Sequence, residues 1–161
     1  PRLPEDAMQL TARSNYAMRL LMYCALRPGA VTPIAEIARA CNMSEAHLGK
    51  IANDLSHHGY VETVRGRAGG VRLARSAGQV NLGEVVRATE LQRCLVECLD
   101  RDTNSCPLIE ACRLRSILAR ALDAFLSVLD GYTLADLVVE RAALSEALGL
   151  ETRGMPEAVA G

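Results

Sequence analysis

The sequence predicts a mainly α-helical fold with a small β-hairpin wing, organised as a winged helix-turn-helix followed by a long dimerisation helix. Three observations predict it. Residues 32–59 hold two short helical patterns separated by a tight turn, as in a helix-turn-helix. A Gly-rich hairpin pattern follows at residues 60–74. Apolar residues then repeat at three-and-four spacing over residues 113–130, which is typical of one long amphipathic helix.

Capping residues define the helices of the N-terminal half. The helical pattern of residues 10–26 stops at an Arg-Pro-Gly turn. Thr32 is expected to be the N-cap of the second helix, with Pro33 in its first helical position. Ser44 is expected to cap the third helix. Because the second helix of a helix-turn-helix enters the major groove, we expect the helix after Ser44 to read DNA.

The third helix and the hairpin carry the candidate DNA contacts. Residues 47–75 hold five basic residues against two acidic ones, in a chain whose net charge is −1. Such a local surplus suits a polyanion, although an ordinary solvated face would have the same composition. Three arginines on a Gly-rich hairpin beside a recognition helix are better explained by nucleic acid. The candidate DNA-binding residues are Ser44, Glu45, His47, Lys50, Arg65, Arg67 and Arg72.

The C-terminal half is expected to contain a short helix over residues 81–90, the long helix, and a final helix over residues 134–148 capped by Thr133. The apolar stripe of residues 113–130 needs a partner surface. Packing within one subunit would cover it. We favour a two-fold dimer through this helix, because a helix-turn-helix protein normally binds symmetric half-sites.

Three cysteines stand close together between the short helix and the long one. Cys98, Cys106 and Cys112 fall within fifteen residues in the pattern C-x7-C-x5-C, and Cys94 lies four residues upstream. Thiolates select zinc, copper(I) or iron–sulfur clusters. Zinc sites usually show short C-x2–4-C pairs, and none occurs among Cys98, Cys106 and Cys112. Disulfides, or cysteines acting only as small core hydrophobes, are the plainer alternatives.

Two other cysteines and all three histidines are given structural interpretations. Cys24 and Cys41 lie on the inward faces of their helices, so we expect them in the core. His57, His58 and His47 are expected at the surface near the recognition helix, with His47 the most plausible DNA contact. Gly49 inside that helix leaves room for another backbone to approach closely.

Composition limits the compartment and the class of protein. The chain of 161 residues is half apolar, enough for one domain or two small ones. No apolar stretch approaches the roughly 18 residues that cross a membrane, and no signal-peptide pattern is found. We therefore expect a cytoplasmic protein without a membrane partner, where thiols stay reduced. Without a Ser/His/Asp set, a phosphate-binding Gly loop or a C-x-x-C motif, an enzyme acting on a small-molecule substrate is disfavoured.

These patterns divide the chain into five consecutive parts. The predicted parts are an N-terminal extension or tag remnant at 1–7, a winged helix-turn-helix DNA-binding domain at 8–80, a connecting helix and cysteine loop at 81–112, a dimerisation helix with a C-terminal helix at 113–149, and a flexible tail at 150–161.

Three stretches resemble one known family. The wing at residues 61–73, the three-cysteine loop, and residues 132–138 (YTLADLV) are similar to bacterial winged-helix regulators that carry an iron–sulfur cluster, with members such as IscR, NsrR and RirA. The resemblance covers about residues 8–150. It implies a homodimer that binds double-stranded operator DNA. It also implies that Cys98, Cys106 and Cys112 ligate a 4Fe–4S cluster, or a 2Fe–2S or degraded form, whose loss or modification changes operator affinity.

The branch of the family depends on the fourth cluster ligand. IscR-like members place a histidine three residues after the last cysteine, where this chain has Arg115. NsrR-like members use an aspartate of the first helix, where this chain has Asn15. Asn15 and Cys94 remain the candidates for a fourth ligand.

The stretches at 14–25 and 106–112 look most like RirA. We therefore expect a repressor that responds to iron availability through a labile cluster. A nitric oxide-sensing repressor of the NsrR type is the alternative, and a cluster-free thiol regulator or a redox enzyme is a distant one.

Overall fold

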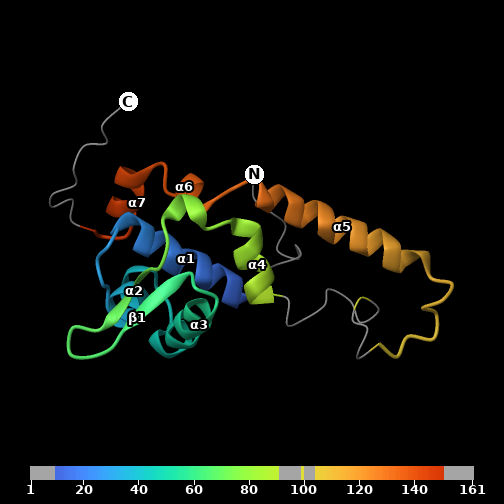
Figure 1. Cartoon of the computed structure of the whole chain (residues 1–161), viewed down its shortest axis with the longest axis horizontal. Coiled ribbons are helices and arrows are strands. Elements are labelled where there is room, and N and C mark those ends of the chain that lie inside the picture. Colours follow the sequence, from blue (N-terminus) through green and yellow to red (C-terminus); the bar gives the residue numbers. More distant parts are fainter. Residues whose placement is uncertain (1–9, 91–98, 100–103, 151–161) are drawn as a thin grey trace.

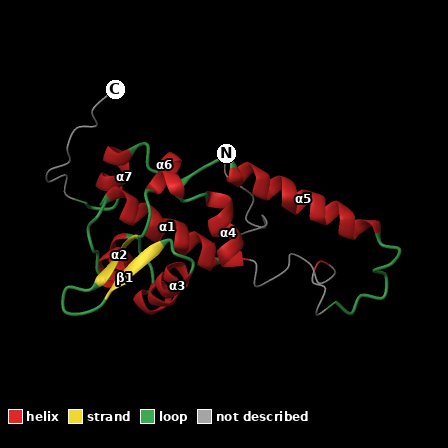
Figure 2. Ribbon diagram, viewed as in Figure 1, coloured by secondary structure: helices red, strands yellow, loops and turns green. Residues whose placement is uncertain are grey.

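The computed structural model describes residues 10–90, 99 and 104–150. Within these residues the order of elements is α1 (Ala12–Leu26), α2 (Ile34–Ala40), α3 (Glu45–His57), β1 (Val61–Val64), β2 (Gly70–Leu73), the 3-10 turn η1 (Ala77–Gln79), α4 (Leu82–Glu90), α5 (Arg113–Asp130), α6 (Leu134–Leu137) and α7 (Arg141–Ala147). Helices dominate, and the two strands form one small antiparallel sheet. Figure 2 shows this sheet at one side of a helical body.

Helix α1 is the centre of the body, with α3, α4, α6 and the sheet packed around it (Figure 1). Its inward face is fully buried at Ala17, Leu20 and Leu21, and Tyr23 is almost fully buried. Complete burial of each leucine contributes about 1.5–3 kcal/mol relative to exposure. Helix α1 therefore fixes the positions of the elements that carry candidate functional residues.

The helix-turn-helix forms where the sequence predicts it, with one change at its start. Ser44 caps α3, since its hydroxyl accepts a hydrogen bond from the His47 N–H at 3.5 Å. The prediction that Thr32 caps α2 is wrong, because the N-cap is Pro33. Thr32 instead pairs with Val71 through two backbone hydrogen bonds of 2.9 and 2.8 Å. Two backbone hydrogen bonds between the wing and the residue before α2 stabilise the fold more than one side-chain cap would.

The wing pairs β1 with β2 in the register Val61 to Leu73 and Val64 to Gly70. Its attachment to α2 requires glycine at position 70. A Cβ on Gly70 would lie 2.1 Å from the carbonyl oxygen of Thr32, far inside van der Waals contact. Glycine here thus lets the strand approach the start of α2.

Helix α5 leaves the body and extends away from it (Figure 1). Leu126 is the one residue of α5 in the buried class. The C-terminal end of α5 is held to α4 by Arg87, whose two terminal nitrogens each lie 2.6 Å from an Asp130 carboxylate oxygen. Gly83 makes room for that carboxylate, since a Cβ there would meet it at 1.9 Å.

The predicted final helix over residues 134–148 is two helices, α6 and α7. Thr133 starts α6 as expected, since its N–H and hydroxyl both donate to the Asp136 carboxylate at 2.7 and 2.8 Å. The chain leaves the helical path between Leu137 and Arg141, and this bend lets α7 pack against α1. Arg141 donates to the carbonyls of Ala25 and Leu26 at 3.2 and 3.0 Å, which places α7 against the end of α1. None of the described helices is both long and apolar enough to cross a membrane.

Candidate DNA interface and cysteine segment

The N-terminal end of α3 presents the candidate base-reading side chains to solvent. Ser44, Glu45, His47 and Lys50 are all exposed. The His47 ring is fixed by an edge-on contact with Tyr16 of α1, with 5.7 Å between ring centroids and 72° between planes. An exposed helix N-terminus with polar side chains is the part of a recognition helix that reaches base edges.

The wing carries its arginines in two different states. Arg65 and Arg67 are exposed at the tip of the hairpin. Arg72 is half-buried and forms an ion pair of 2.8 Å with Glu62, which lies opposite it in the sheet. Arg65 and Arg67 can therefore reach phosphate without losing a contact, whereas Arg72 would have to leave Glu62.

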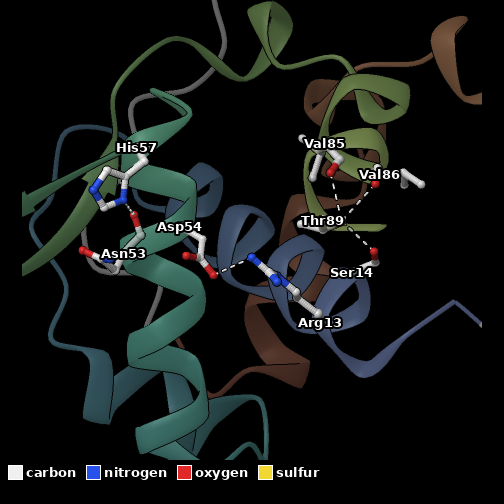
Figure 3. Close-up of polar contacts among 8 residues, drawn as sticks. All are labelled: Arg13, Ser14, Asn53, Asp54, His57, Val85, Val86 and Thr89. Carbon is white, nitrogen blue, oxygen red and sulfur yellow. Dashed lines mark hydrogen bonds and ion pairs between the residues drawn. The ribbon is translucent and has the colours of Figure 1, made fainter. Parts of the chain in front are cut away.

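Helix α3 is anchored to α1 by a polar contact behind its exposed face. Figure 3 shows Arg13 of α1 donating to Asp54 of α3, at 2.7 Å. On the same helix, His57 Nδ1 lies 2.8 Å from the carbonyl of Asn53. His57 and His58 are exposed, as the sequence predicts.

The N-terminal end of α1 is tied in turn to the end of α4. The Glu90 carboxylate accepts hydrogen bonds from the Thr11 N–H and hydroxyl at 2.8 and 2.9 Å, and another from Ser14. Ser14 also bonds the Thr89 hydroxyl at 2.6 Å, as seen in Figure 3. Glu90 was missed by sequence reasoning, because nothing in the sequence connects residues 79 positions apart.

Two cysteines of the predicted cluster lie in the described residues. Cys106 and Cys112 are free thiols, half-buried, at either end of the turns that lead into α5. Cys112 is the N-cap of α5. It lines a shallow hollow with Leu99, Ile109, Arg115, Ser116 and Ala119. Cys94 and Cys98 lie outside the described residues, and the residues that are described contain no group of three side chains able to hold a metal.

The remaining candidates separate clearly by burial. Asn15 is exposed on the first turn of α1. Cys24 and Cys41 are buried in the core, which confirms their structural interpretation. Burial raises the pKa of the Cys24 thiol to about 12 and also raises that of Cys41. Such thiols stay protonated and are poor metal ligands.

Comparison with known proteins identifies the family. The model of the Rrf2 family, described as an iron-dependent transcriptional regulator, matches residues 10–140. The chain belongs to the Rrf2 family. It is 49% identical to the HTH-type transcriptional regulator NsrR of Geobacillus kaustophilus, over 91% of this chain and all of that protein. It is 47% identical to Protein aau3 of Rhizobium meliloti, over 93% of this chain and 97% of that protein.

Solved structures agree with this assignment. CymR, the global cysteine regulator of B. subtilis, is 26% identical and superposes with a TM-score of 0.63, covering 83% of this chain and 98% of that one. IscR of T. potens, at 22% identity, has a TM-score of 0.66 over 83% of this chain and 88% of that one, and supports the fold alone. The predicted winged-helix fold is thus confirmed. The chain is a transcriptional regulator and not an enzyme.

The predicted branch of the family needs correction. Relatives of 42–49% identity carry the name NsrR, so the expectation that the chain is closest to RirA is not supported. The alternative made from the sequence, the NsrR type, agrees better with these relatives.

Proposed function

We propose that this protein is a homodimeric repressor whose affinity for operator DNA depends on an iron–sulfur cluster, and that it responds to nitric oxide as the NsrR resemblance implies. The observation that carries the proposal is the contrast between two kinds of cysteine. Cys106 and Cys112 are free and partly accessible at the start of α5, whereas Cys24 and Cys41 are buried in the core.

The residues present fit such a cluster. Cys106, Cys112 and Cys98 would hold it as thiolates, the ligands that iron–sulfur clusters require. Cys112 begins α5, and helix N-termini favour anionic ligands. Asn15, or Cys94, is the candidate for the fourth position. When bound, the cluster supplies iron atoms that nitric oxide can bind.

The α3 and wing residues would bind DNA in separate ways. His47, Lys50 and the first turn of α3 would contact base edges in the major groove. Arg65 and Arg67 would contact phosphates or the adjacent minor groove. Ser44, Glu45 and Arg72 complete the proposed surface, with Arg72 exchanging Glu62 for phosphate.

The exposed apolar stripe of α5 supports a dimer. Leu114, Ile117 and Val128 are each more than half exposed, and Phe125 is 37% exposed. An amphipathic helix with such a face is stable when another surface covers it. A second copy of α5, related by a two-fold axis, provides a matching stripe. It would also place two α3 helices for half-sites about 34 Å apart.

The contacts of α1 could carry a signal from the cysteine segment to the DNA. Glu90 directly precedes the segment that contains Cys94 and Cys98, and its carboxylate holds the start of α1 through Thr11. Helix α1 then contacts α3 through Arg13 with Asp54 and through Tyr16 with His47. A shift of Glu90 would thus reach the recognition helix through α1.

The test uses anaerobically purified protein and an operator selected from a random duplex library. Nitric oxide should weaken operator binding by loaded wild-type protein by roughly 5- to 150-fold, the usual range of allosteric coupling. Cys106→Ser and Cys112→Ser should lose both visible absorbance and response. Cys41→Ala, which removes a buried thiol, is the control and should keep both. Intact colour and response in the two serine variants would refute the proposal.

Iron availability is the second candidate signal. The family model's description as iron-dependent supports it, and so does Asn15, an exposed neutral amide that binds iron more weakly than a carboxylate. A chelator arm distinguishes the two signals. Release of operator by chelator at a rate that matches loss of absorbance would favour iron. Release by nitric oxide while chelated protein stays bound would favour nitric oxide.

A further inference from the structure

A large cleft is lined by residues of α1, α2 and α7. Arg141 of α7 contacts the C-terminal end of α1 at this cleft, and Figure 1 shows α7 beside that end of α1. The cleft is also lined by the residues after β2. Its volume is about 1290 Å³, above the roughly 300–1,000 Å³ of most small-molecule sites. A single ion would not fill this volume. The kind of ligand that the cleft can bind is therefore inferred from its lining residues.

The walls of the cleft are strongly basic. Arg27, Arg39, Arg75 and Arg141 all line it, and Glu36 is the one acidic side chain among its lining residues. Four guanidinium groups less one carboxylate leave a formal surplus of three positive charges. Glu36 pairs with Arg27. No described carboxylate pairs with the other three arginines.

Two of these arginines are held in place by neutral partners. Within the described part of the chain, the Arg141 side chain donates to backbone carbonyls of α1. Arg75 donates to the carbonyls of Gly59 and His58 at 3.1 and 3.3 Å, and its guanidinium carbon lies 5.0 Å from the centre of the Tyr60 ring. Carbonyl partners orient a guanidinium without neutralising it, and each group has five N–H donors. Arg75 and Arg141 thus keep donors and full charge.

The third arginine differs from the other two in its exposure. Arg39 is exposed on the last turn of α2. Leu73, Leu148 and Leu150 line the same cleft and give it an apolar side. Guanidinium groups bind carboxylate and phosphate through paired hydrogen bonds. Basic and apolar walls together therefore match one class of ligand.

We propose that this cleft binds a small organic anion, with its carboxylate or phosphate held by Arg39, Arg75 and Arg141 and its apolar part against Leu73 and Leu148. The site shares no residue with the proposed cluster ligands or DNA contacts. It would give the protein a second ligand, independent of the cysteines.

Calorimetric titration of the full-length protein at constant ionic strength tests this. The probes are octanoate, phenyl phosphate and inorganic phosphate, which separate carboxylate from phosphate and show the need for an apolar part. At least one of the two organic anions should bind, one per chain, more tightly than inorganic phosphate. Arg39→Gln should weaken that binding about tenfold, the effect of one lost charge-assisted hydrogen bond.

Arg120→Gln is the matched control, since Arg120 is an exposed arginine on α5 outside the cleft. It should leave anion binding unchanged. Arg141→Gln, checked for folding by its melting curve, should act like Arg39→Gln. The proposal is overturned if no organic anion binds, or if both Arg39→Gln and Arg120→Gln weaken binding equally. It is also overturned if Arg39→Gln weakens only binding to duplex DNA. Visible absorbance and operator binding of Arg39→Gln should match wild type, which separates this test from that of the cluster.

Discussion

Gly70→Ala should detach the wing from α2, and the structure sets the size of the effect. The added Cβ would lie 2.1 Å from the Thr32 oxygen, 2.4 Å from its carbonyl carbon and 2.8 Å from the Pro33 nitrogen. All three are backbone atoms, so relief requires the strand or α2 to move by about 1 Å, which costs roughly 1–3 kcal/mol as overpacking. Such a shift also breaks the Thr32–Val71 pair, worth about 1 kcal/mol for each of its two hydrogen bonds.

The expected loss is therefore about 3–5 kcal/mol, a large part of the roughly 5–15 kcal/mol that stabilises a typical domain. Urea unfolding at fixed protein concentration measures it, as a lower midpoint with unchanged slope. Gly78→Ala is the control, because a Cβ there meets nothing within 4 Å. Operator affinity of Gly70→Ala should fall as well. A stability loss below about 1 kcal/mol, or one equal to that of Gly78→Ala, would show that the wing is not held through Thr32.

Three further substitutions examine other contacts. Gly49→Ala should raise the free energy of unfolding by about 1 kcal/mol, because alanine favours a helix more than glycine does and the added Cβ would meet nothing within 4 Å. The same substitution should weaken operator binding if DNA approaches the backbone at Gly49. Glu90→Gln should lower the free energy of unfolding by about 1 kcal/mol, because it weakens the hydrogen bonds that hold the start of α1. Thermal melting measures this loss, with Glu84→Gln as the control. Tyr23→Phe should be less stable than wild type at pH 8 by about 1 kcal/mol, through its lost bond to Glu36. Because burial raises the Tyr23 pKa to about 12, wild type loses this advantage between pH 10 and 12. A constant difference across that range would contradict the assignment.

The sequence predicts what depends on local patterns. Ser44, the Gly-rich hairpin and the apolar stripe of α5 each involve residues within a few positions of one another, and all three appear where expected. Core placement of Cys24 and Cys41 also follows from helical periodicity. Local hydrogen bonding and side-chain spacing determine these features, so a sequence contains enough information to place them.

Contacts between distant residues could not be predicted in the same way. Thr32 has the residue type of an N-cap, yet its backbone pairs with Val71. Arg141 breaks the expected final helix by docking on carbonyls 115 and 116 positions earlier. Each result reflects competition between a local preference worth about 1 kcal/mol and several tertiary contacts made together. The folded structure is needed to see whether the local preference or the tertiary contacts determine the conformation.

Helix α1 is central to the proposed function because it contacts both α3 and α4. Its buried face is apolar and fixes it in the core, while its first turns carry Arg13, Ser14, Asn15 and Tyr16 in succession, with Ser14 buried and Asn15 exposed. Helical geometry directs consecutive side chains to different neighbours. Arg13 thus meets α3 and Ser14 meets α4, while Asn15 points to solvent. The first turn of α1 therefore contacts both the recognition helix α3 and α4, the helix that precedes the cysteine segment. A small displacement of Glu90 is therefore expected to move α3 rather than to be absorbed locally.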